Sequence, residues 1–267
     1  RYFLSIIFPS LSTNLINKNI KRDNLIIALG GGVVGDLSGF IAGTLYRGIK
    51  FIQVPTTLLS MVDSSIGSKT GIDLNEGKNL LGVFKDPLLV FIDLLFLNTL
   101  PDDEYNNGIA EVIKASLIKD KELFSYLKVN ENLDLKHLIK AIEVKRQIVI
   151  NDPFEENERM LLNFGHTFGH AIERKTNYQI KHGVAVSYGM LISIEKGIKL
   201  GITKKEIYDE VLSLLMKFKL VSLPLYASSD LPAYINTDKK NLSDGLRFIL
   251  LEEIGKAIIL KGVRFDD

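Results

Sequence analysis

Two of the four histidines of this chain, His166 and His170, stand four residues apart in the segment "LLNFGHTFGHAIE". The apolar spacing predicts a helix there, and residues four apart on a helix point to the same face. A histidine pair at this spacing can bind zinc, and a catalytic zinc site adds a third protein ligand and an open position. His182 and Glu111 are both available as further ligands. The pattern therefore predicts a metal site, while the spacing leaves open which histidines bind the ion.

An acid and a base share one helix face in "GIAEVIK", where Glu111 precedes Lys114 by three residues. The residues around Glu111 are apolar, so we expect a partly buried carboxylate rather than a surface pair, and a buried carboxylate requires a partner. The remaining histidine, His137 in "LDLKHLIKAI", belongs to an ordinary amphipathic stretch and is predicted to be structural or solvated.

A glycine-rich loop follows the first predicted strand, where "LIIALGGGVVGD" places Gly30, Gly32 and Gly35 in G-x-G-x-x-G spacing before a helical segment over 37–45. Glycines at these positions let the backbone approach a phosphate, and the N-terminus of the following helix supplies amide donors. The alternative is a tight strand-to-helix turn without a ligand. A dinucleotide fingerprint also has an acidic residue ~20 positions later, which binds the ribose. No acid stands there in "FIQVPTT", so a dinucleotide would have its ribose and adenine bound elsewhere.

Cations occur among glycines and small hydroxyls in "MVDSSIGSKTGIDLNEGKNLLGVF", which contains Asp63, Lys69, Lys78 and Asn79. Lysines of a solvated loop are one interpretation. Lysines set among glycines, with an amide beside one of them, also suit an anion such as a phosphate. Both interpretations stay open on the residues alone.

The chain changes character near residue 100. Short runs rich in Ile and Val at 25–29, 51–55 and 88–93 alternate with turns and helical segments, a pattern typical of βαβ units with buried parallel strands. After Pro101, apolar residues recur three or four positions apart in long segments, which predicts helices. We therefore expect an α/β domain over 1–100, incomplete at its N-terminus, and a helical domain over 101–267.

Composition argues against several functional classes. Lys and Arg number 33 against 32 Asp and Glu, so no basic excess indicates a nucleic-acid or membrane partner. The sequence has no cysteine, which removes disulfides and thiolate chemistry and fits a cytoplasmic protein. Its apolar runs are all shorter than the ~20 residues that cross a bilayer.

Several long motifs, in the same order, resemble those of the 3-dehydroquinate synthase family of sugar-phosphate cyclases. They are "ALGGGVVGDLSGFIAGTLYRGIKFIQVPTTLLSMVDSSIGSKTGIDLNEGKNLLGVF", "LPDDEYNNGIAEVIK", "LNFGHTFGHAIE", "HGVAVSYGM" and "DKKNLSDGLRFILLEEIGKA". The resemblance implies a Rossmann-like, NAD-binding α/β domain with a mostly parallel sheet, followed by an all-α metal-binding domain. It also implies a further N-terminal segment, ahead of Arg1, that supplies strands and part of the adenosine-binding site.

The resemblance implies a role for each matching residue. Glu111, His166 and His182 correspond to the metal ligands, and His170 faces the substrate and helps to move protons. The residues implied to act in catalysis are His170, Lys114, Lys145, Asp63 and Lys69. Those implied to bind substrate are Asn79, Arg159, Asn163, one or both of Lys239 and Lys240, and Arg47, which reaches the phosphate in a neighbouring subunit. Those implied to contact the cofactor are Gly32, Val33, Val34, Gly35, Asp36, Thr56, Thr57, Lys69, Lys78, Phe96, Leu97, Asn98 and Thr99.

The implied activity is conversion of 3-deoxy-D-arabino-heptulosonate 7-phosphate to 3-dehydroquinate and phosphate, in the shikimate pathway, by a cytoplasmic homodimer with NAD+ and Zn2+ or Co2+. The alternatives are another sugar-phosphate cyclase, a glycerol-dehydrogenase-like metal-dependent dehydrogenase, and an inactive truncated remnant. Lys145, Arg159 and Asn163 together favour a carboxylated substrate and so the synthase, because the dehydrogenases need no such cluster.

Overall fold

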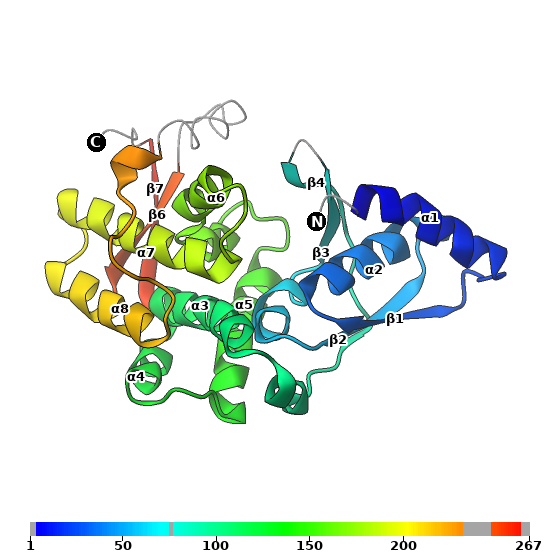
Figure 1. Ribbon diagram of the computed structural model, residues 1–267, viewed down its shortest axis with the longest axis horizontal. Coiled ribbons are helices and arrows are strands. Elements are labelled where there is room, and N and C mark those ends of the chain that lie inside the picture. The colour runs from blue at the N-terminus through cyan, green and yellow to red at the C-terminus, as the bar shows by residue number, and fades with distance from the viewer. Residues whose placement is uncertain (1–3, 75–76, 232–246, 263–267) are drawn as a thin grey trace. The chain divides into compact units, whose positions relative to one another are not determined.

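The computed structural model describes residues 4–74, 77–231 and 247–262, and the chain forms two compact units, Arg1–Tyr105 and Asn106–Asp267 (Figure 1). The sequence places the change of character slightly earlier, near residue 100. The helix α3 (Asp102–Lys119) starts directly after Pro101, just before the division. Within the described residues, every helix is too short or too polar to pass through a bilayer.

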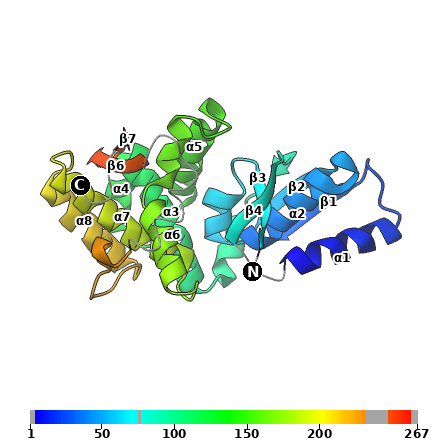
Figure 2. The same ribbon diagram turned by 90° about the horizontal axis from the view of Figure 1, so that it is seen from above.

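A parallel sheet forms the centre of the N-terminal unit, as the runs rich in Ile and Val predict. Its strands are β1 (Leu25–Gly30), β2 (Lys50–Pro55) and β5 (Leu89–Val90), in the order β1–β2–β5. Parallel neighbours need a crossover, and the helix α2 (Gly32–Thr44) with the short helix η1 (Leu45–Arg47) provides it between β1 and β2. Figures 1 and 2 both show α2 lying along this sheet. The C-terminal ends of the three strands therefore share one edge, where α2 begins.

The lysine-containing segment, for which a solvated loop was one of the two interpretations, forms a hairpin in the N-terminal unit. The strands β3 (Lys69–Leu74) and β4 (Gly77–Phe84) pair antiparallel. Gly71 lies opposite Gly82, and a Cβ on Gly71 would lie 2.6 Å from the Leu81 carbonyl oxygen. Glycine is rare in strands, so propensity misses a hairpin whose close approach depends on it. The unit also contains α1 (Leu4–Asn17), where no element was expected, and the short helices η2 (Ser60–Ser64) and η3 (Leu94–Thr99).

One face of β1 is exposed, although its apolar run predicts a strand buried on both faces. Leu25, Ile27 and Leu29 are 45%, 62% and 59% exposed, whereas Ala28 is buried. Successive side chains on a strand point to opposite faces, so α2 covers one face of β1 and the other meets solvent. Among the described residues, β2 is the only strand paired with β1. We call Leu25, Ile27 and Leu29 the open face of β1.

Helices make up most of the C-terminal unit, as the apolar spacing predicts, but the unit is not all-α. The strands β6 (Arg247–Glu253) and β7 (Lys256–Lys261) form an antiparallel hairpin around Gly255. The apolar run "FILL" in β6 suits a buried strand or a buried helix equally, so periodicity alone does not reveal the hairpin. The helices of the unit are α3, α4 (Lys121–Val129), α5 (Leu135–Asn151), α6 (His166–Lys175), α7 (His182–Lys199) and α8 (Lys205–Lys217), with the short helices η4 (Glu158–Asn163) and η5 (Ser228–Asp230).

Two glycines allow three of these helices to approach closely. A Cβ on Gly189 of α7 would lie 2.0 Å from the carbonyl oxygen of Gly165, which precedes α6, so these helices meet backbone to backbone. A Cβ on Gly183 of α7 would lie 2.3 Å from the carbonyl oxygen of Asn107 in α3. Because only glycine lacks a Cβ, only glycine permits these contacts. They bring α7 against both the start of α6 and the middle of α3.

Candidate functional site

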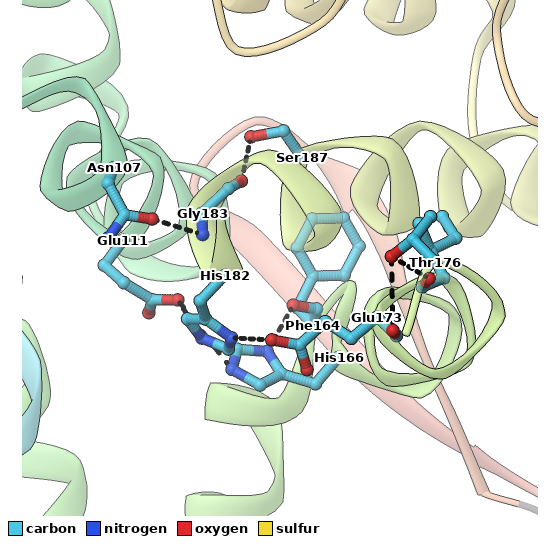
Figure 3. A network of polar contacts seen from close by, with 10 residues as sticks. Asn107, Glu111, Phe164, His166, Glu173, Thr176, His182, Gly183 and Ser187 are labelled. Atoms are coloured by element: carbon cyan, nitrogen blue, oxygen red, sulfur yellow. Dashed lines mark hydrogen bonds and ion pairs between the residues drawn. The ribbon is translucent and has the colours of Figure 1, made fainter. Parts of the chain in front are cut away.

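Glu111, His166 and His182 converge from three helices of the C-terminal unit (Figure 3). Glu111 lies in the middle of α3, His166 is the first residue of α6, and His182 is the first residue of α7. Oε1 of Glu111 is 3.8 Å from Nε2 of His166 and 3.6 Å from Nε2 of His182. One possible ligand atom from each residue lies within 4.8 Å of the other two. Residues far apart in the sequence thus present one oxygen and two nitrogens to one small volume.

The donor atoms of this group fit a divalent metal ion. Both carboxylate oxygens of Glu111 are buried and accept no hydrogen bond from the described residues, although Lys114 Nζ forms an ion pair with Oε2. Burying a carboxylate is unfavourable unless its charge is compensated, and a bound divalent ion would add to the compensation that Lys114 gives. Carboxylate oxygen and imidazole nitrogen are usual zinc ligands, and three protein ligands leave one coordination position for a substrate.

Burial and neighbouring charges act in opposite directions on these groups. Burial raises the pKa of Glu111, but the Lys114 ammonium and the two histidines outweigh it and hold that pKa well below its usual range. Burial, with the nearby Lys114 charge, holds the pKa of His166 well below its ordinary value. Burial also lowers the pKa of His182, but contacts with Glu111 and Glu173 outweigh it and raise this pKa to about 9. At neutral pH Glu111 is therefore charged and His166 is neutral, the forms that bind metal.

His170, the second member of the H-x-x-x-H pair, lies beside this group. Its ring centroid is 5.4 Å from that of His166, edge to face, and 6.3 Å from that of His182. Together with Glu173 and His182, His170 forms a second group whose possible ligand atoms lie within 4.8 Å of one another. The two groups share His182, so the spacing of His166 and His170 does not by itself define the set around Glu111.

His137, predicted to be structural or solvated, has local partners on α5 and α4. Its ring stacks on Tyr126 with centroids 3.4 Å apart. Its Nδ1 atom lies 2.7 Å from Oδ1 of Asp134, the residue that caps α5. These contacts involve only α4 and the start of α5, and His137 belongs to neither group of possible ligands. A substitution of His137 is therefore a suitable control for substitutions of the other histidines.

Three residues that the resemblance assigns to the substrate, Lys145, Arg159 and Asn163, lie on α5 and η4 of the same unit. The Arg159 side chain is buried, and its Nη1 donates to the Pro153 carbonyl oxygen. The side-chain amide of Asn163 donates to the Glu155 carboxylate. Glu155 was not predicted, and it orients the amide of Asn163.

Asp152 shapes the loop that leads into η4. Its carboxylate accepts the backbone N–H groups of Glu156, Asn157 and Arg159 at 3.0, 2.7 and 2.9 Å. Three hydrogen bonds to one buried carboxylate fix the path of the chain between α5 and η4. Asp152 therefore determines where the backbone of Arg159 lies.

The glycine loop of the N-terminal unit lies between β1 and α2, as its spacing predicts, but α2 begins at Gly32 rather than at residue 37, so Gly32 and Gly35 belong to the start of the helix. Gly31 precedes the first helical residue, Gly32, and its carbonyl oxygen accepts the N–H of Gly35 at 3.1 Å. Thr56, directly after β2, donates its N–H to the carbonyl oxygen of Gly30 at 3.0 Å. The loop and the end of β2 therefore lie side by side at the sheet edge where α/β proteins bind nucleotides.

The helix η3 also starts from this edge of the sheet. It follows the third parallel strand, β5, and Asp93 caps it by accepting the N–H of Leu95 at 2.9 Å. Parallel strands end at the same edge, so η3 leaves the sheet where the glycine loop does. This edge thus carries most of the residues that the resemblance assigns to the cofactor: Gly32, Val33, Val34, Gly35, Asp36, Thr56, Thr57, Phe96, Leu97, Asn98 and Thr99.

The other assigned residues of the N-terminal unit occupy separate places. Asp63 lies in η2 beside the glycine loop, since a Cβ on Gly32 would lie 2.9 Å from Oγ of Ser64. Lys69 begins β3 and is exposed. Arg47 ends η1 at the opposite end of the 13-residue helix α2, which is ~20 Å long at ~1.5 Å per residue. Arg47 therefore does not lie beside the glycine loop of its own chain.

Four assigned residues have side chains beyond the part of the chain that the structure describes. Lys239 and Lys240 lie outside the described residues. Lys78 and Asn79 are in β4, but their side chains are not described. Their roles stay predictions from the resemblance.

Two residues that were not predicted contact His182 or its neighbour Gly183. Oε1 of Glu173 is 3.3 Å from Nδ1 of His182, and Oδ1 of Asn107 accepts the N–H of Gly183 at 2.6 Å. Glu173 carries a signal in the sequence, because it follows His166 by seven residues, or two helical turns. Asn107 carries no such signal, since its partner lies 76 residues away in the sequence.

Two family models together match most of the chain: one described as 3-dehydroquinate synthase N-terminal, over residues 6–107, and one described as 3-dehydroquinate synthase C-terminal, over residues 108–241. The 3-dehydroquinate synthase of Dictyoglomus turgidum (strain DSM 6724 / Z-1310) is 46% identical over 266 residues, which are 96% of this chain and 75% of that protein. The 3-dehydroquinate synthase of Clostridium perfringens (strain 13 / Type A) is 47% identical over 261 residues, 95% of this chain and 75% of that protein.

Solved structures share the fold. The 2-epi-5-epi-valiolone synthase from Streptomyces hygroscopicus subsp. jinggangensis 5008, with NAD+ and Zn2+ bound, has a TM-score of 0.89 and 27% identity, over 98% of this chain and 76% of that one. A 2-deoxy-scyllo-inosose synthase complexed with carbaglucose-6-phosphate, NAD+ and Co2+ has a TM-score of 0.83 and 27% identity. The match covers 96% of this chain and 75% of that one. These likenesses confirm the expected fold class, an α/β unit followed by a helical unit.

Proposed function

The chain belongs to the 3-dehydroquinate synthase family, and we propose that it is an NAD- and metal-dependent lyase that converts 3-deoxy-D-arabino-heptulosonate 7-phosphate to 3-dehydroquinate and phosphate. The observation that carries this proposal is the convergence of Glu111, His166 and His182 within 4.8 Å. The same unit holds Arg159 and Asn163. A metal group and a group suited to a carboxylate, on one unit, fit an acidic sugar substrate.

Glu111, His166 and His182 would hold the ion, which we propose to be Zn2+ or Co2+. Bound there, the ion would supply a Lewis acid for the substrate hydroxyl that is oxidised. Glu111 contributes a negative charge, and each imidazole contributes a ring nitrogen, so the ion keeps a net positive charge. His182, whose pKa is raised to about 9, would release a proton when the ion binds. The zinc- and cobalt-containing neighbours of similar fold support this choice of metal.

The sheet edge of the N-terminal unit would hold NAD+, through residues 32–36, 96–99, Thr56, Thr57, Lys69 and Lys78. Backbone amides at the start of α2 point out of the helix and suit the pyrophosphate. The cofactor supplies an acceptor for hydride early in the reaction and a donor for the same hydride later, so reduced cofactor does not accumulate.

Side chains of the C-terminal unit would bind the substrate and move protons. Lys145, Arg159 and Asn163 hold the carboxylate, and the guanidinium of Arg159 offers a planar fork for its two oxygens. His170 lies beside the group of Glu111, His166 and His182, and its imidazole would exchange protons with the substrate. Lys114, which contacts Glu111, can donate to a substrate oxygen from its ammonium group.

The phosphate would be held by Lys69 and Asn79, with Arg47 from a second subunit, so we propose a homodimer. The position of Arg47, at the end of α2 opposite to its own glycine loop, supports a role in a neighbouring copy. One or both of Lys239 and Lys240 would complete the substrate contacts. Asp63, beside Ser64 and so close to the glycine loop, would take part in catalysis. Several cationic contacts fix one substrate pose, which lowers the entropic part of each barrier.

Phosphate release tests the proposal. Dialysed protein is incubated with the heptulosonate phosphate, with and without added NAD+ and Zn2+. We expect release that requires both additions, with no net gain in NADH absorbance. His166→Ala should abolish release, whereas His137→Ala should not change it. Net NADH formation would instead indicate a dehydrogenase, and no release by protein shown to bind NAD+ and zinc would reject the synthase.

A further inference from the structure

His182 lies between two carboxylates. On one side of its ring, Nε2 is 3.6 Å from Oε1 of Glu111, and on the other side, Nδ1 is 3.3 Å from Oε1 of Glu173. Figure 3 shows the ring between these two side chains. We propose that Glu173 is a positioning residue, which fixes the ring of His182 so that Nε2 faces the metal ion. This inference rests on the metal site proposed above.

The chemistry of the two groups explains how Glu173 would act. An ionised carboxylate only accepts hydrogen bonds, so the ring nitrogen that faces Glu173 carries the proton. With the proton on Nδ1, the lone pair for the metal is on Nε2, the atom on the side of Glu111. A carboxylate that accepts a hydrogen bond from a ligating histidine also makes the imidazole a stronger electron-pair donor to the metal and fixes the orientation of the ring. Glu173 thus selects both the tautomer and the angle of the ring.

The backbone around Glu173 is held in place. Glu173 is 2% exposed and lies in the last turns of α6. Its carbonyl oxygen accepts the N–H of Tyr178 at 2.7 Å and the hydroxyl of Thr176 at 3.2 Å. These contacts hold the backbone at the C-terminal end of α6. Burying a carboxylate is costly unless it has polar partners, and Nδ1 of His182 is one such partner of Glu173.

The substitution Glu173→Gln tests this role, because it keeps the shape of the side chain and removes the charge. Zn2+ affinity is measured by competition with a chromophoric chelator, and Co2+ is used to record the visible spectrum of the bound ion. We expect Zn2+ and Co2+ to bind about 10- to 100-fold more weakly, with a changed Co2+ spectrum. Circular dichroism of the metal-free variant checks that it is folded. Glu143→Gln makes the same change on the surface of α5, where Glu143 pairs with Arg146, and should alter neither readout.

Several results would overturn the inference. One is equal affinity and an identical Co2+ spectrum in folded Glu173→Gln. Another is a wild type that binds two ions, one of which Glu173→Gln loses, because Glu173 would then be a ligand itself. If Glu173→Gln does not fold, Glu173→Asp decides in the same assays: it keeps the charge but withdraws the carboxylate by one methylene, so a weaker affinity supports the inference and an unchanged one rejects it. A wild type that binds neither ion would overturn this inference and the proposed metal site together.

Discussion

Asn107 and Gly183 are joined by a hydrogen bond of 2.6 Å, from the backbone N–H of Gly183 to Oδ1 of Asn107. Asn107 lies one helical turn before Glu111 on α3, and Gly183 follows His182 on α7. The bond satisfies one of the N–H groups that have no partner within the first turn of a helix. It therefore links the position of one proposed ligand to that of another, although neither Asn107 nor Gly183 offers a ligand atom to the group.

Asn107→Ala should weaken both the fold and metal binding. The N–H of Gly183 loses its acceptor in a buried place, which costs about 1–3 kcal/mol of the free energy of unfolding. We also expect weaker Zn2+ binding, since the start of α7 is less firmly held against α3. Thermal unfolding and chelator competition measure the two effects. Asn151→Ala, which removes an exposed amide contact to Glu158, is the control. Unchanged stability of Asn107→Ala would contradict this account.

Zinc should stabilise the protein, and His166 should be required for it. A ligand that binds only the folded state at 100 times its Kd adds about 2.7 kcal/mol to the free energy of unfolding. Differential scanning calorimetry should show the unfolding midpoint rising with Zn2+ and falling back with a chelator. The rise should be lost in His166→Ala and kept in His137→Ala, which alters a histidine that contacts Tyr126 and Asp134 instead. A rise that survives in His166→Ala would place the ion elsewhere.

Asp152→Ala should impair the proposed substrate contacts more than the fold. Without the carboxylate, the backbone of Glu156, Asn157 and Arg159 loses three hydrogen bonds, and the loop no longer holds Arg159 in place. Misplacement of a binding group by about 1 Å can reduce the rate up to about 100-fold, so we expect kcat/KM to fall roughly 10- to 100-fold. Steady-state phosphate release checks this. Asp209→Ala, an exposed aspartate on α8, should leave kcat/KM as it is. Equal kinetics of Asp152→Ala and the wild type would show that the loop keeps its path without these bonds.

The open face of β1 should promote self-association. Contiguous exposed apolar side chains on a strand with one paired edge favour contact with other molecules. Replacing Ile27 and Leu29 together by Thr should reduce the fraction of particles larger than a dimer in light scattering. Val129→Thr replaces an apolar residue of α4 that is 79% exposed and should have little effect. A particle-size distribution that the double variant leaves unchanged would argue against this role of the open face.

The sequence contains enough to predict the two-part fold and much of the site. The alternation of Ile- and Val-rich runs with glycine turns gives the parallel sheet, and the three- and four-residue spacing gives the helices. The spacing of His166 and His170 points to a metal site but does not choose among the histidines. The resemblance selects His182 and Glu111, and both come from other helices. That convergence depends on helix packing, which periodicity does not describe.

The features that the sequence does not reveal depend on contacts between distant segments. The β3–β4 hairpin contains Gly71 and Gly82, which local propensity places outside strands but which the close approach of the two strands requires. The exposed side of β1 cannot be inferred from its apolar residues, because the same run suits a strand covered on both faces. Asn107 belongs to no recognisable motif, and its hydrogen bond to Gly183 forms only because α7 packs on α3.

The backbone contact between α6 and α7 has a consequence for motion. Helices that slide past one another do so through layers of interlocking side chains, and at Gly165 and Gly189 no such layer exists. We therefore expect α6 and α7 to move as one rigid piece in any rearrangement. His166 and His182 are the first residues of these two helices, so we expect the spacing of their imidazoles to be preserved.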